Sequence, residues 1–144
     1  MKQSVLALDV GEVRIGVAIC QPEVKLALPK CVIRRQGRQA DLEALVNLAR
    51  QEQSTLWVVG LPRQADDSLS ESARKIISFA RRLLHASQLP VVFVDEWETT
   101  AQAQELLLSA DVSRAKRRKL VDKLAATLIL ERYLEHGPLD ISLE

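Results

Sequence analysis

The arrangement of apolar residues changes its period near residue 38, and this change constrains the fold more than any other feature of the sequence. Before that point, apolar runs separated by short turns predict three antiparallel strands at 4–10, 14–20 and about 28–34. Beyond it, apolar residues recur at helical spacing, and helices alternate with short strands. A meander followed by βαβ units predicts an α/β fold with a mixed five-stranded sheet and helices on both faces.

The second part of the chain is expected to hold two strands, at 56–59 and 91–94, and helices at about 39–53, 99–109 and 113–136. Ser68 and Glu71 match a capping box, which predicts that a further helix begins there. The residues of that helix expected to be buried are Leu69, Ala73, Ile76, Ile77, Ala80, Leu83 and Leu84. Those expected to face solvent are Arg74, Lys75, Ser78, Arg81 and Arg82.

The length and composition predict one soluble domain that spans residues 1–144. Of these residues, 47% are hydrophobic and 27% are charged, as is ordinary for a globular protein. No apolar run approaches the roughly 18 residues that a membrane span needs, and the N-terminus lacks a signal-peptide pattern. We therefore expect a cytoplasmic protein with no membrane partner, whose oligomeric state the sequence leaves open.

Three carboxylates stand where metal-dependent phosphate chemistry would need them. Asp9 ends an apolar run, Glu96 follows another directly after Asp95, and Asp122 lies on an otherwise apolar helical face. Two strand ends and one helix face can converge on a single point, and three carboxylates at one point repel unless a cation joins them. The pattern predicts a divalent-metal site formed by Asp9, Glu96 and Asp122.

Each carboxylate also has a purely structural interpretation. Asp9 can bond its own backbone where a strand meets a turn. Adjacent strand residues face opposite ways, so only one of Asp95 and Glu96 is expected to reach the site, and either can be a solvated strand end. Asp122 can pair with Arg118 one turn back, although an unpaired carboxylate on that apolar stripe would cost several kcal/mol.

The net charge of only +1 conceals two basic clusters. One is Arg34, Arg35 and Arg38, and the other occupies five of the six positions 114–119, namely Arg114, Lys116, Arg117, Arg118 and Lys119. Local clusters in a nearly neutral protein indicate a directed anionic partner. The second cluster is either a solvated helix face or a phosphate-binding stripe beside Asp122. With 3% aromatic residues, a base-stacking platform is poorly supported.

At these residues the chain resembles the YqgF/RuvX family of RNase H-like nucleases, which includes Holliday junction resolvases and pre-16S rRNA nucleases. The resemblance extends over nearly the whole chain in the right order. The residues that carry it are 7–11 with 14–18, then 58–62, then 90–96 with Thr99 and Thr100, and lastly 113–118 with 121–126.

The resemblance implies an RNase H-like fold and places the family's three acidic residues on Asp9, Glu96 and Asp122. It also favours maturation of the 5′ end of 16S rRNA over junction resolution. Some positions depart from the family's pattern: Glu12 and Val13 replace a small hydroxyl residue and lysine, Trp97 replaces arginine, and 63–68 lacks the usual glycine. We expect these departures to affect substrate affinity more than metal binding.

The prediction is therefore a Mg²⁺- or Mn²⁺-dependent phosphodiesterase that acts on structured nucleic acid, either an rRNA precursor or branched DNA, and through rRNA meets the ribosome. Arg14 would contact the scissile phosphate or brace the carboxylates, and residues 114–119 would hold the backbone. One alternative is an actin- or hexokinase-like ATP-binding fold, which needs two such domains. The other is a non-catalytic ribosome- or transcription-associated binder with vestigial acids.

Overall fold

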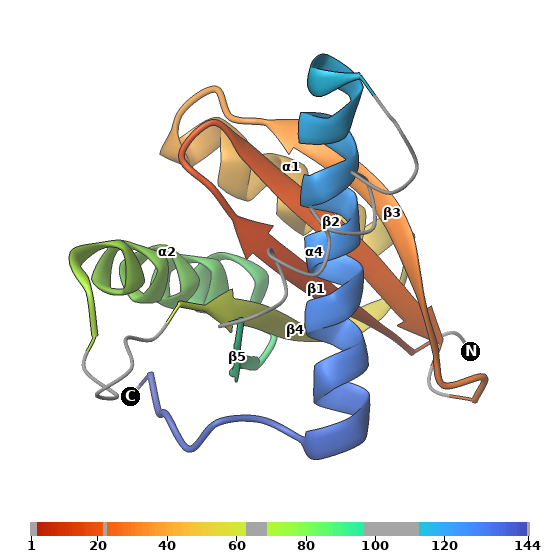
Figure 1. Ribbon diagram of the computed structural model, residues 1–144. Coiled ribbons are helices and arrows are strands. Elements are labelled where there is room, and N and C mark those ends of the chain that lie inside the picture. Colours follow the sequence, from red (N-terminus) through yellow and green to blue (C-terminus); the bar gives the residue numbers. More distant parts are fainter. Residues whose placement is uncertain (1–2, 22, 63–68, 97–112, 144) are drawn as a thin grey trace.

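The computed structural model describes residues 3–21, 23–62, 69–96 and 113–143. The helix expected at 99–109 lies outside these residues. The described elements are β1 (Ser4–Val10), β2 (Arg14–Gln21), β3 (Leu26–Arg34), α1 (Arg38–Gln51), β4 (Ser54–Leu61), α2 (Glu71–Ser87), β5 (Val91–Asp95) and α4 (Arg114–His136) (Figure 1). Their order confirms the predicted meander followed by βαβ units.

The five strands form one mixed sheet in the order β3-β2-β1-β4-β5. The pairs β1–β2 and β2–β3 are antiparallel, whereas β4 runs parallel to both β1 and β5. β1 is central, and its residues Leu6, Ala7 and Leu8 are fully buried. Because β1, β4 and β5 are parallel, their carboxyl ends meet at one edge of the sheet, where α/β proteins usually bind their ligands.

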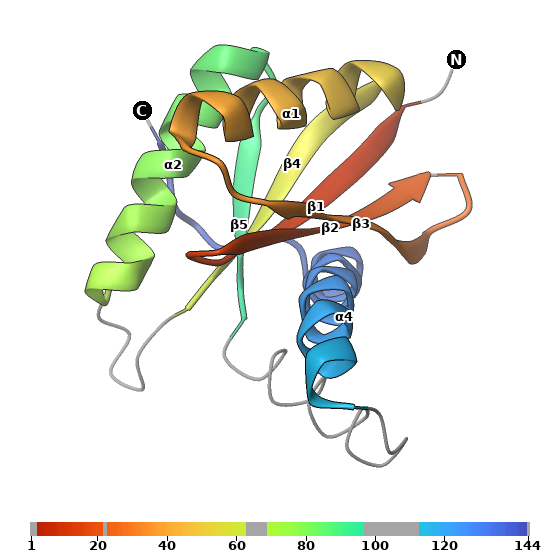
Figure 2. The ribbon, with the colours of Figure 1, turned by 90° about the horizontal axis from the view of Figure 1, so that it is seen from above.

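Helices cover both faces of the sheet, as predicted. Among the described helices, α1 and α2 lie on one face and α4 lies on the other (Figure 2). Leu6 and Leu8 face α1 and α2, where the core also contains Trp57 and Phe93. Ala7 alternates to the opposite face and packs with Ala126 of α4. Small residues on both sides bring α4 close to the sheet, as the sequence predicts. Within the described part of the chain, no helix has the length and apolar character that a membrane span requires.

The start of α2 differs from the prediction. The N-cap is Ser70 rather than Ser68, because the Ser70 hydroxyl accepts a hydrogen bond from the Ala73 backbone N–H (3.1 Å). Leu69 consequently precedes the helix and is 38% exposed, whereas Phe79, which was not predicted to be buried, belongs to the core. Of the other residues predicted to be buried, Ala73, Ile76, Ala80 and Leu83 are buried, whereas Ile77 and Leu84 are only partly buried.

α4 begins and ends as predicted. Ser113 caps it by accepting a hydrogen bond from the backbone N–H of Lys116 (3.4 Å), and the helix ends at His136. Gly137 follows with a positive φ of 75°, a conformation that glycine adopts without steric cost. The helix thus runs along the sheet on the face opposite α1 and α2, carrying the 114–119 cluster in its first turns.

Candidate active site

Two of the three predicted carboxylates meet at the carboxyl edge of the sheet. Asp9 is the penultimate residue of β1, and Glu96 follows the last residue of β5. The Glu96 backbone N–H donates to the Leu61 carbonyl at the end of β4 (3.3 Å), which fixes where the chain leaves the sheet. The side chains of Asp9 and Glu96 are hydrogen-bonded to each other. The structure therefore brings together residues that are far apart in the sequence.

Both side chains lie on the face of the sheet that α4 covers. Asp9 shares a strand face with Ala7, and Glu96 shares one with Val94, and both of these apolar residues belong to the core cluster around α4. Asp95 alternates to the other face, as expected from its position next to Glu96. The sequence prediction that one member of the Asp95–Glu96 pair reaches the site agrees with this geometry.

The electrostatics of the pair are those of two acids held close together. The pKa of Glu96 is raised to about 8, first by burial of its carboxyl group, then by the Asp9 charge and its hydrogen bond, and last by the Asp95 charge. Near neutral pH a proton therefore holds the two carboxyl groups together. A divalent cation would satisfy both groups without that proton, and oxygen-only donors suit Mg²⁺ and Mn²⁺. The two residues fit the predicted metal.

Glycine at position 60 of β4 leaves room for Glu96. A methyl group added there would lie 2.6 Å from Glu96 Oε2 and closer still to Ile129 Cδ1 of α4. No real Cβ approaches a neighbouring atom so closely, so the absence of a side chain lets the carboxylate and the helix pack over the same strand position. Gly60 is one of the residues that carry the family resemblance, and the structure supplies its physical reason.

We expect Gly60→Ala to lower the free energy of unfolding by about 1–3 kcal/mol, the usual cost of overpacking, and to reduce activity per folded molecule by displacing Glu96. Gly137→Ala is the control, because its cost comes from the positive φ alone and open space surrounds it. Denaturant unfolding and cleavage rates measured on both variants check this. Equal activity per folded molecule in the two variants would mean that Gly60 does not position Glu96.

Asp122 lies on α4, one turn before Ala125 and Ala126, which are fully buried against the sheet. Its side chain is outside the described part of the structure, as are those of Arg114, Arg117, Arg118 and Lys119. Lys116 is exposed on α4. Among the described side chains, no three His, Cys, Asp or Glu residues form a group that could hold a metal ion. The pair Asp9–Glu96 is the part of the predicted site that the structure brings together.

The turn between β1 and β2 is tight and lies next to Asp9. The Gly11 N–H donates to the Arg14 carbonyl (2.9 Å), and a Cβ on Gly11 would lie 2.8 Å from that oxygen. Arg14 begins β2, is partly buried, and does not line the cavity beside the acids. The tight reversal predicted at Gly11 is confirmed, whereas the role of Arg14 stays a prediction.

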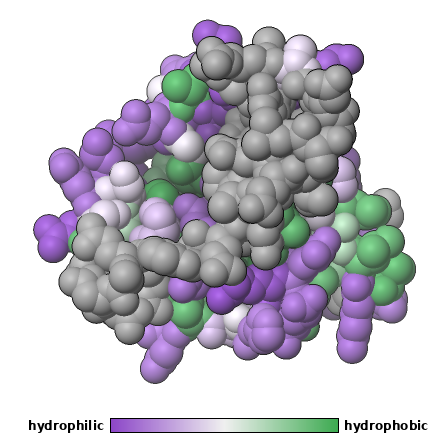
Figure 3. Space-filling view, viewed as in Figure 1, coloured by the Kyte–Doolittle hydropathy of each residue, from purple (hydrophilic) through white to green (hydrophobic). Residues whose placement is uncertain are grey.

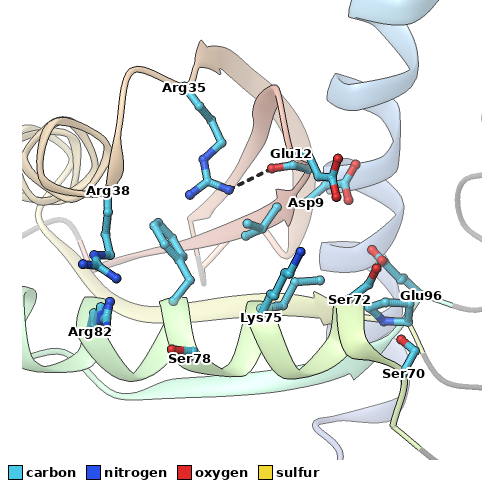
Figure 4. A pocket seen from close by; sticks show the side chains of 15 residues that line it. Asp9, Glu12, Arg35, Arg38, Ser70, Ser72, Lys75, Ser78, Arg82 and Glu96 are labelled. Atoms are coloured by element: carbon cyan, nitrogen blue, oxygen red, sulfur yellow. Dashed lines mark hydrogen bonds between the residues drawn. The ribbon is translucent and has the colours of Figure 1, made fainter.

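A buried ion pair that sequence reasoning missed braces this turn. Asp41, 2% exposed in α1, accepts hydrogen bonds from Arg35 Nε (2.9 Å) and from the Gln36 backbone N–H (2.9 Å). Arg35 also donates through Nη1 to the Gly11 carbonyl (2.9 Å; dashed in Figure 4), and its guanidinium lies 5.0 Å from the centre of the Phe79 ring. Arg35, which the sequence places in a basic cluster, is therefore a structural link between the end of β3, α1 and the β1–β2 turn.

A cavity of about 760 Å³ opens beside the two acids and extends along α2 toward α1 (Figure 4). It lies between α2 and the β1–β2 turn, where Figure 3 shows a hollow with hydrophilic residues along its rim. Its cationic lining residues are Arg35, Arg38, Lys75 and Arg82, and its serines are Ser70, Ser72 and Ser78. Lys75 and Arg82 are exposed, as predicted, but they form the wall of a cavity rather than an open helix surface.

Comparison with solved structures identifies the fold. Thermus thermophilus RuvC in complex with a Holliday junction substrate superimposes with a TM-score of 0.60 at 16% identity, covering 95% of this chain and 99% of that chain. The fowlpox virus resolvase in complex with Holliday junction DNA gives a TM-score of 0.54 at 14% identity, with 92% and 97% coverage. The fold is thus the RuvC-like form of the RNase H fold.

Sequence comparison then gives the family. Residues 3–136 match the family model described as "RuvX: Holliday junction resolvase". A protein of Caldanaerobacter subterraneus named "Putative pre-16S rRNA nuclease" is 41% identical over 91% of this chain and 95% of its own length. A protein of Moorella thermoacetica with the same name is 44% identical over 91% and 94%. The chain belongs to the RuvX family, which confirms the resemblance seen in the sequence.

Proposed function

We propose that this protein is a divalent-metal-dependent nuclease that processes the 5′ end of a 16S rRNA precursor. The observation that carries the proposal is the Asp9–Glu96 pair, two strand-end carboxyl groups hydrogen-bonded to each other at the ligand-binding edge of a RuvC-like sheet. Relatives about 40% identical over nine tenths of the chain carry a name that specifies pre-16S rRNA. An rRNA substrate also suits the cytoplasmic location predicted from the sequence.

Asp9, Glu96 and Asp122 would hold Mg²⁺ or Mn²⁺. When bound, such an ion would lower the pKa of water and stabilise negative charge on the leaving oxygen. Glu96 would have to release the proton that it shares with Asp9 before both carboxylates could act as ligands. The position of Asp122 supports its inclusion, because Asp9 and Glu96 lie on the face of the sheet that α4 covers.

The cations near the start of α4 would hold the nucleic-acid backbone on that face of the sheet. Arg114, Lys116, Arg117, Arg118 and Lys119 follow the Ser113 cap, within two to three turns of Asp122. Contacts of this kind bind phosphates and carry no sequence information. In this proposal Arg14, at the first residue of β2, contacts the scissile phosphate or braces the acids.

Junction resolution is the second candidate, because the family model is described by that activity. A cleavage assay with Mn²⁺ on an end-labelled rRNA precursor and on a labelled four-way DNA junction separates the two, with Glu96→Gln as the inactive control. We expect the precursor to be cut and the junction to stay intact. Cleavage of the junction alone would favour resolution. Binding without cleavage of either substrate by folded wild-type protein would support a non-catalytic factor instead.

A further inference from the structure

The cavity beside the acids continues as a groove between α1 and α2, and three of its cations have no part in the proposed metal site. They are Arg38 at the first residue of α1, and Lys75 and Arg82 on α2. Arg38 and Arg82 point toward one another across the groove, while Lys75 lies between that pair and the end that holds Asp9 and Glu96 (Figure 4). The space lined by these three residues is the α1–α2 groove.

The Arg38–Arg82 arrangement works against stability. Two guanidinium groups that face one another repel. Among the ion pairs of the described residues none includes Arg38 or Arg82, and Asp41, the buried carboxylate of α1, pairs with Arg35 instead. Arg38 also occupies the first turn of α1, the end at which the helix dipole favours an anion and disfavours a cation. An anion held between the two arginines would remove both penalties.

Arg35, the fourth cation that lines the cavity, differs from Arg38 and Arg82 because its charge is neutralised. Arg35 is held by Asp41, the Gly11 carbonyl and the Phe79 ring, so it braces the wall and has its charge neutralised. It also covers the face of Phe79, and the other lining side chains in the described part of the chain offer no exposed aromatic ring for a base to stack on. The groove therefore presents charges and hydroxyl groups, which suit a phosphate backbone rather than bases.

The spacing along α2 allows contacts to more than one phosphate. Lys75 and Arg82 are seven residues apart, which corresponds to about 10 Å along a helix. Two cations at this separation can contact different phosphates of the same strand. Ser72 and Ser78 line the same stretch and can donate hydrogen bonds to phosphate oxygens.

We propose that the α1–α2 groove is a second backbone-binding site, which holds the RNA strand as it continues from the scissile phosphate at Asp9 and Glu96. The inference rests on the proposed function for the identity of the strand. It adds a contact surface on the face of the sheet opposite α4 and the 114–119 cluster. The strand would pass Lys75 first and have one of its phosphates bound between Arg38 and Arg82.

The test compares two double variants, each with one arginine removed from α1 and one from α2. The groove variant, Arg38→Gln with Arg82→Gln, removes the two arginines that face one another. The control variant, Arg50→Gln with Arg74→Gln, removes the same charge from exposed positions outside the groove. Both are made in a Glu96→Gln background. Binding of a labelled single-stranded RNA that spans the precursor–mature boundary is then measured without metal, over a range of salt concentrations.

We expect the groove variant to lose about tenfold in affinity near physiological salt and to lower the slope of log K against log salt by about 0.7, since the two arginines bind one phosphate and each single-strand phosphate contact contributes about 0.7. The control should keep the parent slope. Equal slopes in the two variants, or no RNA binding by the parent, would overturn the groove assignment. The proposed function is judged separately: failure of the wild type to cleave with Mn²⁺ overturns it, whatever the slopes.

Discussion

Asp9→Asn is expected to lower the cleavage rate by roughly a thousandfold or more, which corresponds to about 4 kcal/mol of lost transition-state stabilisation. The substitution keeps the shape of the side chain but removes one of the two carboxyl groups that could ligate a cation at the sheet edge. Binding of Mn²⁺, measured by calorimetry, should weaken in parallel. The fold should survive, because the substitution removes the repulsion that Asp9 and Glu96 would experience once Glu96 ionises.

The matched control is Asp140→Asn, which makes the same chemical change at an exposed position beyond α4. It should leave metal binding and cleavage unchanged. Undiminished Mn²⁺ binding by the Asp9→Asn variant would exclude Asp9 as a ligand and would leave its contact with Glu96 as a purely structural one.

The second large effect is a dependence of stability on pH that Glu96 imposes on the metal-free protein. A carboxyl group whose pKa rises from 4.5 in the unfolded chain to about 8 in the folded protein binds more protons when folded. Stability is then fully present below pH 4.5 and is lost as pH rises toward and through 8. By linkage, the loss is on the order of 3–5 kcal/mol, or roughly 10 °C in melting temperature.

Thermal unfolding in the presence of a chelator, from pH 5 to pH 9, checks this expectation. Glu96→Gln should lack the loss, so that it melts above wild type at pH 8 and near it at pH 5. Adding Mn²⁺ at pH 8 should raise the melting temperature of wild type and not that of the variant, because metal binding stabilises only the protein that can bind it. Parallel pH profiles for the two proteins would mean that Glu96 ionises as it does in the unfolded chain.

Much of the fold follows from local patterns in the sequence. The apolar runs of β1 and β5 and the helical stripe of α2 are long enough to decide the element type, and the turn at Gly11 fixes the first hairpin. The start of α2 was predicted wrongly, because Ser68 and Ser70 are both chemically suitable caps. The choice between them depends on which hydroxyl reaches a free N–H once the helix has packed.

The candidate site was predictable in part. Asp9 and Glu96 can be identified from the sequence because each stands at the end of an apolar strand. The parallel order of β1, β4 and β5 then brings the two residues together. Asp41 gives no such signal, since its partner Arg35 lies in what reads as a basic cluster. The α1–α2 groove was predictable only in part. Arg38 belongs to a basic cluster that indicates an anionic partner, whereas Arg82 looks like an ordinary solvent-facing residue, and only the packing of α1 against α2 places the two face to face.

The most direct test of a three-carboxylate metal site is the Asp122→Ala variant, with thermal stability and turnover of the rRNA precursor measured on the same sample. If Asp122 is a ligand beside Asp9 and Glu96, the variant should fold with undiminished stability and bind RNA nearly as wild type does, yet show no Mn²⁺-dependent cleavage. If Asp122 is only the ion-pair partner of Arg118, stability should fall while the folded fraction cleaves normally. Full activity per folded molecule would contradict the site proposed for this protein.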